Sequence, residues 1–112
     1  GEDVLPDDQR WILEIAKIIK VGYLQQNAYN KEDTYVPLEK QYAMLKAIEY
    51  LYEKGREGLK LGIPTSQLKN ADIFSEFIKM KYTVPNDDLS GIDRLKEEID
   101  SFYETLFERY TN

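Results

Sequence analysis

The chain has 112 residues, of which 42% are hydrophobic and 32% are charged, a balance typical of one domain with a packed core. It contains no Cys and no His, which excludes disulfides, zinc fingers, iron–sulfur clusters and nucleophile–histidine pairs. Its 15 basic and 21 acidic residues give a net charge of −6. Because that charge repels the phosphate backbone, we expect no nucleic-acid partner.

The first predicted element is a helix over about residues 6–25. Pro6 suits a first helical turn, and Asp7 and Asp8 follow it at the positive end of the helix dipole. Gly22 lies inside this pattern and marks a close helix contact, a bend or a tolerated glycine. Apolar residues recur at spacings of three and four, as on one face of a helix: Trp11, Ile12, Ile15, Ile18, Ile19 and Tyr23.

Residues 27–37 lose this pattern and have the Asn, Asp, Thr and Pro content of an ordered loop. A second helix is predicted over residues 38–61, with Gly62-Ile63-Pro64 as its stop signal. Gly55 and Gly58 weaken its last turns, so its end is predicted at residue 61 or several residues earlier. Its apolar stripe consists of Leu38, Tyr42, Leu45, Ile48, Leu51, Tyr52 and Leu59.

The rest of the chain predicts further helices. Thr65 or Ser66 is predicted to cap a short helix, and residues 71–80 are apolar enough for a buried helix, with a strand as the alternative. After a turn, Ser90 is predicted to cap a final amphipathic helix. We expect an all-α fold, a single bundle-like domain of four to five helices over residues 1–112. The stripe of the final helix is Ile92, Leu95, Ile99, Phe102, Leu106 and Tyr110.

The residues predict no catalysis by this chain alone. There is no G-x-x-x-x-G-K-[ST] string to hold a triphosphate, and the G-x-x-x-G spacing of Gly58 and Gly62 is interpreted as a helix terminator. Paired carboxylates at 7/8, 32/33, 87/88 and 97/98 are interpreted as surface or helix-start charges, because acid–base catalysis requires burial that these contexts do not indicate. The eight acidic and three basic residues of 87–112 are interpreted as a solubility feature, with a docking face as the alternative.

Two segments invite a functional interpretation. GEDVLPDD places the apolar Val4, Leu5 and Pro6 among acidic residues before a helix, as suits an exposed contact with another protein, although a frayed helix start has the same composition. GYLQQNAYNKEDTY places amides and tyrosines at a helix end and in the following loop. A tyrosine there can stack on a flat ligand or anchor the loop.

In these segments the sequence resembles the C-terminal helical domain of the catalytic A subunit of archaeal-type and vacuolar-type rotary ATPases. The resemblance rests on the order and spacing of LPDD, GYLQQNAY, DTY and EKQY within residues 3–48. The family has an L-P-E type acidic loop, then F-L-Q-Q-N-A-F, D-T-Y and E-K-Q-Y. Tyr23 and Tyr29 stand where the family usually has Phe, and Val36 where it often has Cys.

The resemblance implies a fragment whose nucleotide-binding core, with the P-loop, catalytic carboxylate and magnesium site, lies outside this chain. In the family the aromatic at the position of Tyr29 packs against adenine. The acidic loop there faces the rotor stalk, and it corresponds to Glu2, Asp3, Val4, Leu5, Pro6, Asp7 and Asp8. No catalytic or metal-binding residue is implied here, and no cofactor is implied beyond ATP or ADP with Mg in the full subunit.

The implied function is that of a domain in a proton- or sodium-coupled rotary ATP synthase or ATPase. The domain completes the adenine pocket and transmits nucleotide-driven movement to the central rotor stalk. The implied partners are the rest of the catalytic chain, neighbouring B subunits and the stalk subunits. No apolar run reaches the ~20 residues of a membrane span, and the first residues do not resemble a signal peptide. We therefore expect a cytoplasmic location, peripheral to the membrane in the ATPase complex, without direct membrane insertion.

A second hypothesis comes from another functional class. An acidic helical adaptor that acts on its own would use LPDD and the acidic face of the last helix to bind a basic partner helix. A P-loop domain encoded upstream distinguishes the rotary ATPase hypothesis from this one.

Overall fold

A computed structural model of the protein describes residues 5–24 and 35–111. In chain order these residues form α1 (Asp7–Ile18), the π-helical segment η2 (Ile19–Leu24), α3 (Leu38–Lys60), α4 (Thr65–Leu68), α5 (Ala71–Thr83) and α6 (Ser90–Thr111). No residue in these two ranges belongs to a strand. The all-α prediction is therefore confirmed, with five α-helices in the described part, and the strand alternative for residues 71–80 is wrong.

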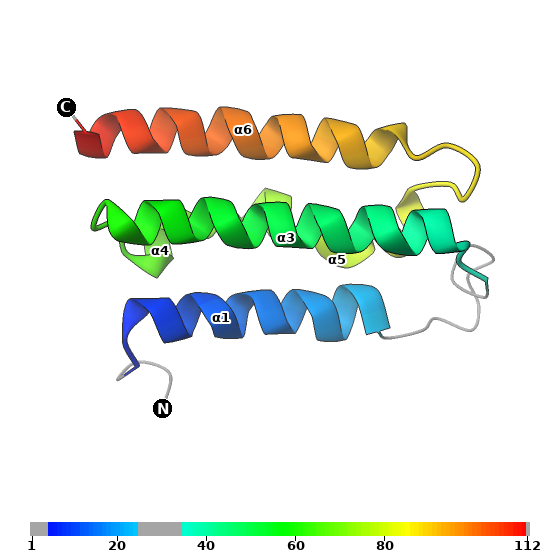
Figure 1. The fold of residues 1–112 in the computed structure, drawn as a ribbon, viewed down its shortest axis with the longest axis horizontal. Helices are drawn as coiled ribbons and strands as arrows, with labels where there is room; N and C mark the ends of the chain where they lie inside the picture. The colour runs from blue at the N-terminus through cyan, green and yellow to red at the C-terminus, as the bar shows by residue number, and fades with distance from the viewer. Residues whose placement is uncertain (1–4, 25–34, 112) are drawn as a thin grey trace.

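The three longest helices lie side by side, with α3 between α1 and α6 and with α4 and α5 behind them (Figure 1). The chain runs in opposite directions along α1 and α3 and in the same direction along α3 and α6. This arrangement buries one apolar cluster between the two layers. Its largest fully buried apolar side chains are Trp11, Tyr103, Phe77, Ile18, Met44, Leu51, Ile63, Leu68, Met80, Ile92 and Ile99.

The first helical path is confirmed from Asp7 to Leu24, but its last six residues are π-helical. Gly22 lies in this wider turn and is buried. A Cβ atom at Gly22 would lie 2.8 Å from the carbonyl oxygen of Phe77 and 2.9 Å from Cα of Ile78. Of the three interpretations of Gly22, the structure therefore supports the close helix contact, because only a residue without a side chain admits the α5 backbone there.

Helix α3 continues through both of its glycines to Lys60, so the earlier end considered for this helix is wrong. A Cβ atom at Gly55 would lie 2.0 Å from the indole of Trp11, and one at Gly58 would lie 2.3 Å from Leu68. The helix stops where predicted, because Gly62 has φ +85° and closes a Schellman motif. In that motif Ile63 N–H donates to Gly58 O and Gly62 N–H donates to Leu59 O, each at 3.0 Å.

The predicted caps are wrong. Pro64 precedes α4, which has no side-chain cap. Helix α5 is capped by Asn70, whose Oδ1 accepts from Ile73 N–H at 3.0 Å. Helix α6 already includes Ser90, and its start is held by Asp88 Oδ1, which accepts from Ser90 N–H at 3.1 Å. Asn and Asp cap helices at least as well as Ser and Thr. Residue type alone therefore could not show which of the neighbouring polar residues caps each helix.

The apolar stripes are partly corrected as well. In α3, Leu38, Tyr42 and Leu45 are 81%, 65% and 44% exposed, although they were predicted to belong to the core stripe. The first turns of α3 are instead buried through Lys40 and Met44, each 0% exposed. In α6 the stripe includes the buried Tyr103, which the prediction omitted, whereas Tyr110 is exposed.

Candidate functional site

The described residues of the segment predicted to contact a partner protein, residues 5–8, lie at one end of the molecule. Leu5 and Pro6 precede α1, and Asp7 and Asp8 form its first turn. Glu2, Asp3 and Val4 lie outside the described residues, as does Tyr29, the predicted adenine contact. For these four residues the sequence-based prediction therefore stays a prediction.

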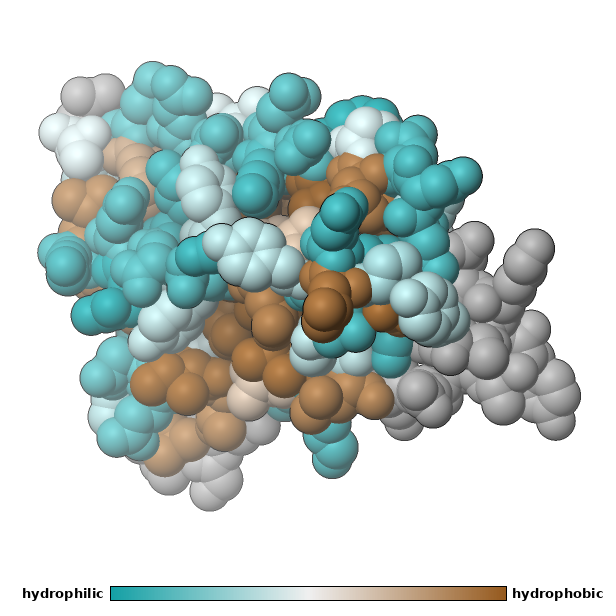
Figure 2. Space-filling view, turned by 45° about the vertical axis from the view of Figure 1, so that its right-hand side comes forward, coloured by the Kyte–Doolittle hydropathy of each residue, from teal (hydrophilic) through white to brown (hydrophobic). Residues whose placement is uncertain are grey.

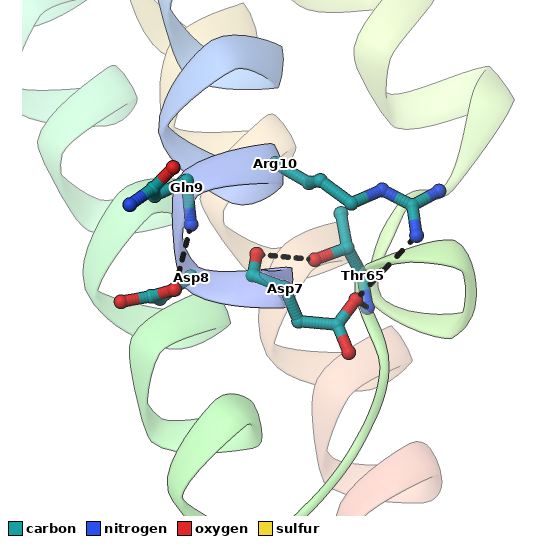
Figure 3. A network of polar contacts seen from close by, with 5 residues as sticks. All are labelled: Asp7, Asp8, Gln9, Arg10 and Thr65. Atoms are coloured by element: carbon teal, nitrogen blue, oxygen red, sulfur yellow. Dashed lines mark hydrogen bonds and ion pairs between the residues drawn. The ribbon is translucent and has the colours of Figure 1, made fainter. Parts of the chain in front are cut away.

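Asp7 takes part in a network that ties the start of α1 to the start of α4 (Figure 3). Its Oδ1 accepts from Thr65 N–H at 3.0 Å, and Thr65 Oγ1 donates to the Asp7 carbonyl oxygen at 2.7 Å. Arg10 lies 3.9 Å from the same carboxylate. The Asp7 carboxylate thus accepts a hydrogen bond from a backbone N–H that the first turn of α4 leaves without a helical partner. Asp7 has an internal structural role in addition to its place in the acidic segment.

Asp8 differs from Asp7 because it is exposed, and the hydrogen bond described for its side chain is with the next residue in the chain. Its Oδ1 accepts from the N–H of the next residue, Gln9, at 2.9 Å (Figure 3). Within the described part of the acidic segment, Asp8 therefore offers a carboxylate to a partner without removing a tertiary contact.

In the sequence, the segment that contains Tyr29 joins η2 to α3, and the start of α3 lies at the opposite end of the molecule from the start of α1 (Figure 1). Described residues on both sides of it contact the C-terminal half of α5 or the turn after α5. Gly22 packs against the backbone of Phe77 and Ile78. Tyr35 accepts a hydrogen bond at its carbonyl oxygen from Asn86 Nδ2 at 2.8 Å. The two predicted contact segments are thus connected by the full length of α1 and η2.

Lys40 is a buried cation near this end. It is 0% exposed, and its Nζ donates to Lys81 O at 2.6 Å, to Asn86 Oδ1 at 3.0 Å and to Val84 O. Carbonyl oxygens at the end of α5 carry the negative end of the helix dipole, which favours an ammonium group there. Lys40 and Gln41 belong to the EKQY string, and Gln41 Nε2 donates to Val36 O at 2.8 Å. Two residues of that string therefore fix the backbone around the start of α3.

Two acidic side chains face each other across α5 and α6. A hydrogen bond with Glu98, burial, and the charges of Glu98 and Asp72 raise the pKa of Glu76 from 4.5 to about 7. The groove beside this pair is lined by Met80, Val84 and Leu95 and includes the cationic Arg94. Glu98 is exposed, as predicted for a surface carboxylate, but its contact with Glu76 was not predicted.

The outer face of the α1–α3 layer carries apolar side chains. Figure 2 shows the largest brown area over the middle and lower part of the molecule, where Figure 1 places α3 and α1. Tyr42 and Leu45 of α3 and Ile12 of α1 are among the exposed apolar residues, and Ile12 is 51% exposed. Exposed apolar area of this kind is typical of a surface that another part of a protein covers.

The described residues, 5–24 and 35–111, contain no group of three acidic side chains placed to hold a metal ion. Within the same ranges, no helix is both long enough and apolar enough to cross a lipid bilayer.

Residues 1–69 match the family described as the C-terminal domain of V and A type ATP synthase. The chain is 62% identical over 110 residues to V-type ATP synthase alpha chain 2 of Clostridium tetani, covering 98% of this chain and 19% of that protein. It is 54% identical to the V-type ATP synthase alpha chain of Halothermothrix orenii, again over 98% of this chain and 19% of the relative. It is 38% identical to the corresponding chain of the A-type ATP synthase of Methanopyrus kandleri, over 96% of this chain and 18% of the relative.

The chain therefore belongs to the family of C-terminal domains of V and A type ATP synthases. The resemblance found in the sequence is confirmed. The chain spans about a fifth of the length of these curated relatives.

Sequence reasoning missed the buried Lys40 and the Glu76–Glu98 pair. Lys40 is four residues before Met44 and eight before Ile48, which is the spacing of the buried face, so its burial was detectable. Glu76 and Glu98 are on different helices, and their contact depends on how α5 packs on α6. No pattern within either helix indicates it.

Proposed function

We propose that this chain is the C-terminal domain of the catalytic subunit of a proton- or sodium-coupled rotary ATP synthase or ATPase, and that it connects nucleotide occupancy with the central rotor stalk. Tyr29 packs on adenine, and the segment from Glu2 to Asp8 contacts the stalk. The observation that carries this proposal is the family match over residues 1–69, which includes both segments. The names of the relatives as ATP synthase chains agree with it.

The residues of this chain suit contact with the base of a nucleotide better than contact with its phosphates. No P-loop string occurs in the sequence, and the described residues provide no grouped metal ligands. An aromatic side chain stacked on a base contributes ~1–3 kcal/mol, which is far below the free energy of micromolar binding, about 8 kcal/mol. In the proposed function the phosphates and Mg²⁺ of ATP are bound by the remainder of the subunit, where the bond-making chemistry takes place.

The arrangement of the helices supports the mechanical part of the proposal. One segment leads into α1 and the other joins η2 to α3 in the sequence, and Trp11, Gly22 and Asp7 fix α1 and η2 to the other helices. A packed unit of this kind moves as a body when a ligand shifts one end. The exposed face of α3 suits contact with the rest of the subunit, and the neighbouring B subunits and stalk complete the cytoplasmic, membrane-peripheral assembly.

Nucleotide affinity tests the assignment of Tyr29. In the full-length subunit, assembled in its complex, Tyr29→Ala is expected to weaken ATP binding by roughly fivefold to a hundredfold, the equivalent of one lost stacking contact. Tyr29→Phe keeps the ring and is the matched control, with affinity close to that of the unmodified protein. If ATP binds the Ala variant as tightly as the unmodified subunit, Tyr29 does not pack on adenine.

A further inference from the structure

Helix α3 is apolar on two sides in its first turns. Leu38, Tyr42 and Leu45 are 81%, 65% and 44% exposed, and their spacings of four and three place them on one face of the helix. The other side of the same turns is buried through Met44 and Ala47, each 0% exposed. A helix that is apolar on both sides is typical of one that packs between two partners. Here the core of the domain covers one side, and the other faces outward.

The outward face of α3 changes its chemistry halfway along the helix. Glu49, Glu53 and Arg56 continue the spacing of the exposed residues and are exposed themselves. Glu49 lies 3.3 Å from Lys46, and Glu53 lies 3.5 Å from Arg56. Ion pairs between residues three apart are typical of a helix surface that faces water. The apolar part of the face therefore ends near Leu45, and a covering partner is expected on the first half of α3.

Helix α1 and the start of η2 extend this apolar surface. Ile12, 51% exposed, and the partly buried Ile19 are seven residues apart and share one flank. On the other flank, Leu13 and Glu14 line a groove with Thr65 of α4, which lies behind the layer of long helices (Figure 1). Ile12 and Ile19 thus belong to the front, where Figure 2 shows the brown area. We call this surface the α1–α3 apolar face: Ile12, Ile19, Leu38, Tyr42 and Leu45.

The length of the relatives indicates what covers this face. The family is described as a C-terminal domain, and the match to the Clostridium tetani chain leaves about four-fifths of that protein outside it. A second copy of this chain would bring another net charge of −6, which opposes self-association. An apolar contact is non-directional and permits small sliding movements, as suits a domain that shifts against the body of its own subunit.

We propose that the α1–α3 apolar face packs against the nucleotide-binding part of the same polypeptide. This rests on the proposed function, in which the chain is one domain of a longer catalytic subunit. Because both parts belong to one polypeptide, their effective concentration is high without any other subunit present. The face is therefore covered in the full-length subunit before that subunit joins its complex.

Labelling of introduced cysteines tests the interface. The full-length subunit, with its other cysteines replaced, carries either Tyr42→Cys in the apolar half of α3 or Glu53→Cys in the charged half. Both positions are exposed in the domain, so Glu53→Cys is the matched control. In the purified, unassembled subunit we expect N-ethylmaleimide to label Tyr42→Cys at least about tenfold more slowly, because a covered thiol reacts only when the interface opens. In denaturant the two rates should be equal.

Leu45→Cys is the second variant, should Tyr42→Cys not fold, and the same protection is expected. Protection that is independent of subunit concentration, with Glu53→Cys freely labelled, supports the interface. Equally fast labelling at both positions overturns it. Protection that disappears on dilution identifies a second copy as the partner, and protection that develops only on assembly identifies a neighbouring subunit. Either of these results overturns the assignment to the same polypeptide, and equal protection of Glu53→Cys overturns the assignment to the apolar half.

The labelling rates and the nucleotide affinity of Tyr29→Ala are separate measurements. If Tyr42→Cys is labelled as fast as Glu53→Cys while Tyr29→Ala binds ATP more weakly, the interface fails and the adenine contact of the proposed function stands. If Tyr42→Cys is protected while Tyr29→Ala binds ATP normally, the adenine contact fails and the interface stands.

Discussion

Trp11 of α1 packs directly against Gly55 of α3. The indole is 0% exposed, its Nε1 donates to Tyr52 O at 3.1 Å, and its ring fills the space that a side chain at Gly55 would occupy. Phe74 of α5 lies on another side of the indole, with ring centroids 5.8 Å apart. One tryptophan therefore joins three helices, and the glycine is what admits it.

Gly55→Ala is expected to destabilise the domain, although the same change in an exposed helix stabilises by ~1 kcal/mol. The added Cβ would lie 2.0 Å from Trp11 Cε2, so the indole and the helix must separate, at a cost of about 1–3 kcal/mol or more. Chemical denaturation measures the change. Glu53→Ala, at an exposed site of the same helix, is the control and should change stability little. A Gly55→Ala variant at least as stable as the unmodified protein would show that α1 does not pack there.

The acidic pair of Glu76 and Glu98 predicts a specific pH dependence of stability. Because the pKa of Glu76 is raised from 4.5 to about 7, the folded state binds this proton more tightly than the unfolded chain does. Its stabilising contribution is complete below pH 4.5 and is lost as the pH rises to about 7. Both side chains are exposed, so solvent screening limits the effect to less than about 1 kcal/mol.

Glu76→Gln removes this proton linkage. We expect the variant to gain stability relative to the unmodified protein as the pH is raised from about 5 to about 8, as measured by denaturant unfolding at each pH. Glu97→Gln, which changes an exposed neighbour on α6, should show no comparable trend. A Glu76→Gln difference that is flat over this range would mean that the two carboxyl groups do not share a proton.

At the scale of the elements, the start of α1 has two acidic residues with different environments. Asp7→Ala is expected to lower stability by roughly 1 kcal/mol, because Thr65 N–H loses its acceptor. Asp8→Asn should leave stability unchanged and reduce coupling, measured as ions transported per ATP turned over in the assembled complex. Normal coupling in Asp8→Asn would limit Asp8 to a helix-start role.

The helices were predictable from the sequence because their stripes and stop signals are local. The buried stripe of α1, in which Ile12 was wrongly included because it is 51% exposed, and the Gly62 stop in α3 needed no knowledge of the rest of the molecule. In contrast, Leu38 and Tyr42 share the helical spacing of buried residues but face outward. The spacing of apolar residues identifies one face of a helix, but it does not show what covers that face. Most of the length of the related proteins lies outside this chain.

The candidate site was predictable only through family resemblance. Nothing in the spacing of Tyr29 distinguishes a base contact from a loop anchor. The contacts of Gly22 with the α5 backbone and of Asn86 with Tyr35 depend on tertiary packing, and the second joins residues 51 positions apart in the chain. Local patterns do not contain that information, and the EKQY string includes Lys40 without indicating that it is buried.

In the whole molecule, one packed unit of 45 × 31 × 20 Å joins the two proposed contact segments. In the sequence, one segment leads into α1 and the other joins η2 to α3. The start of α1 and the start of α3 lie at opposite ends of the molecule (Figure 1). If the helices between them repacked when nucleotide bound, movement at one end would be absorbed within the domain. Transmission to the stalk requires that the domain keep its internal distances.

Distances between spin labels in the full complex test this claim most directly. These 112 residues contain no cysteine, so in a complex whose other cysteines have been replaced, labels can be attached at Gln9→Cys in α1 and Glu39→Cys in α3, both exposed. A third label is placed on the nucleotide-binding part of the subunit. We expect the Gln9–Glu39 distance to be the same with and without nucleotide, while the distance from Gln9 to the third label changes. A nucleotide-dependent change in the Gln9–Glu39 distance, or no change in either distance, would contradict it.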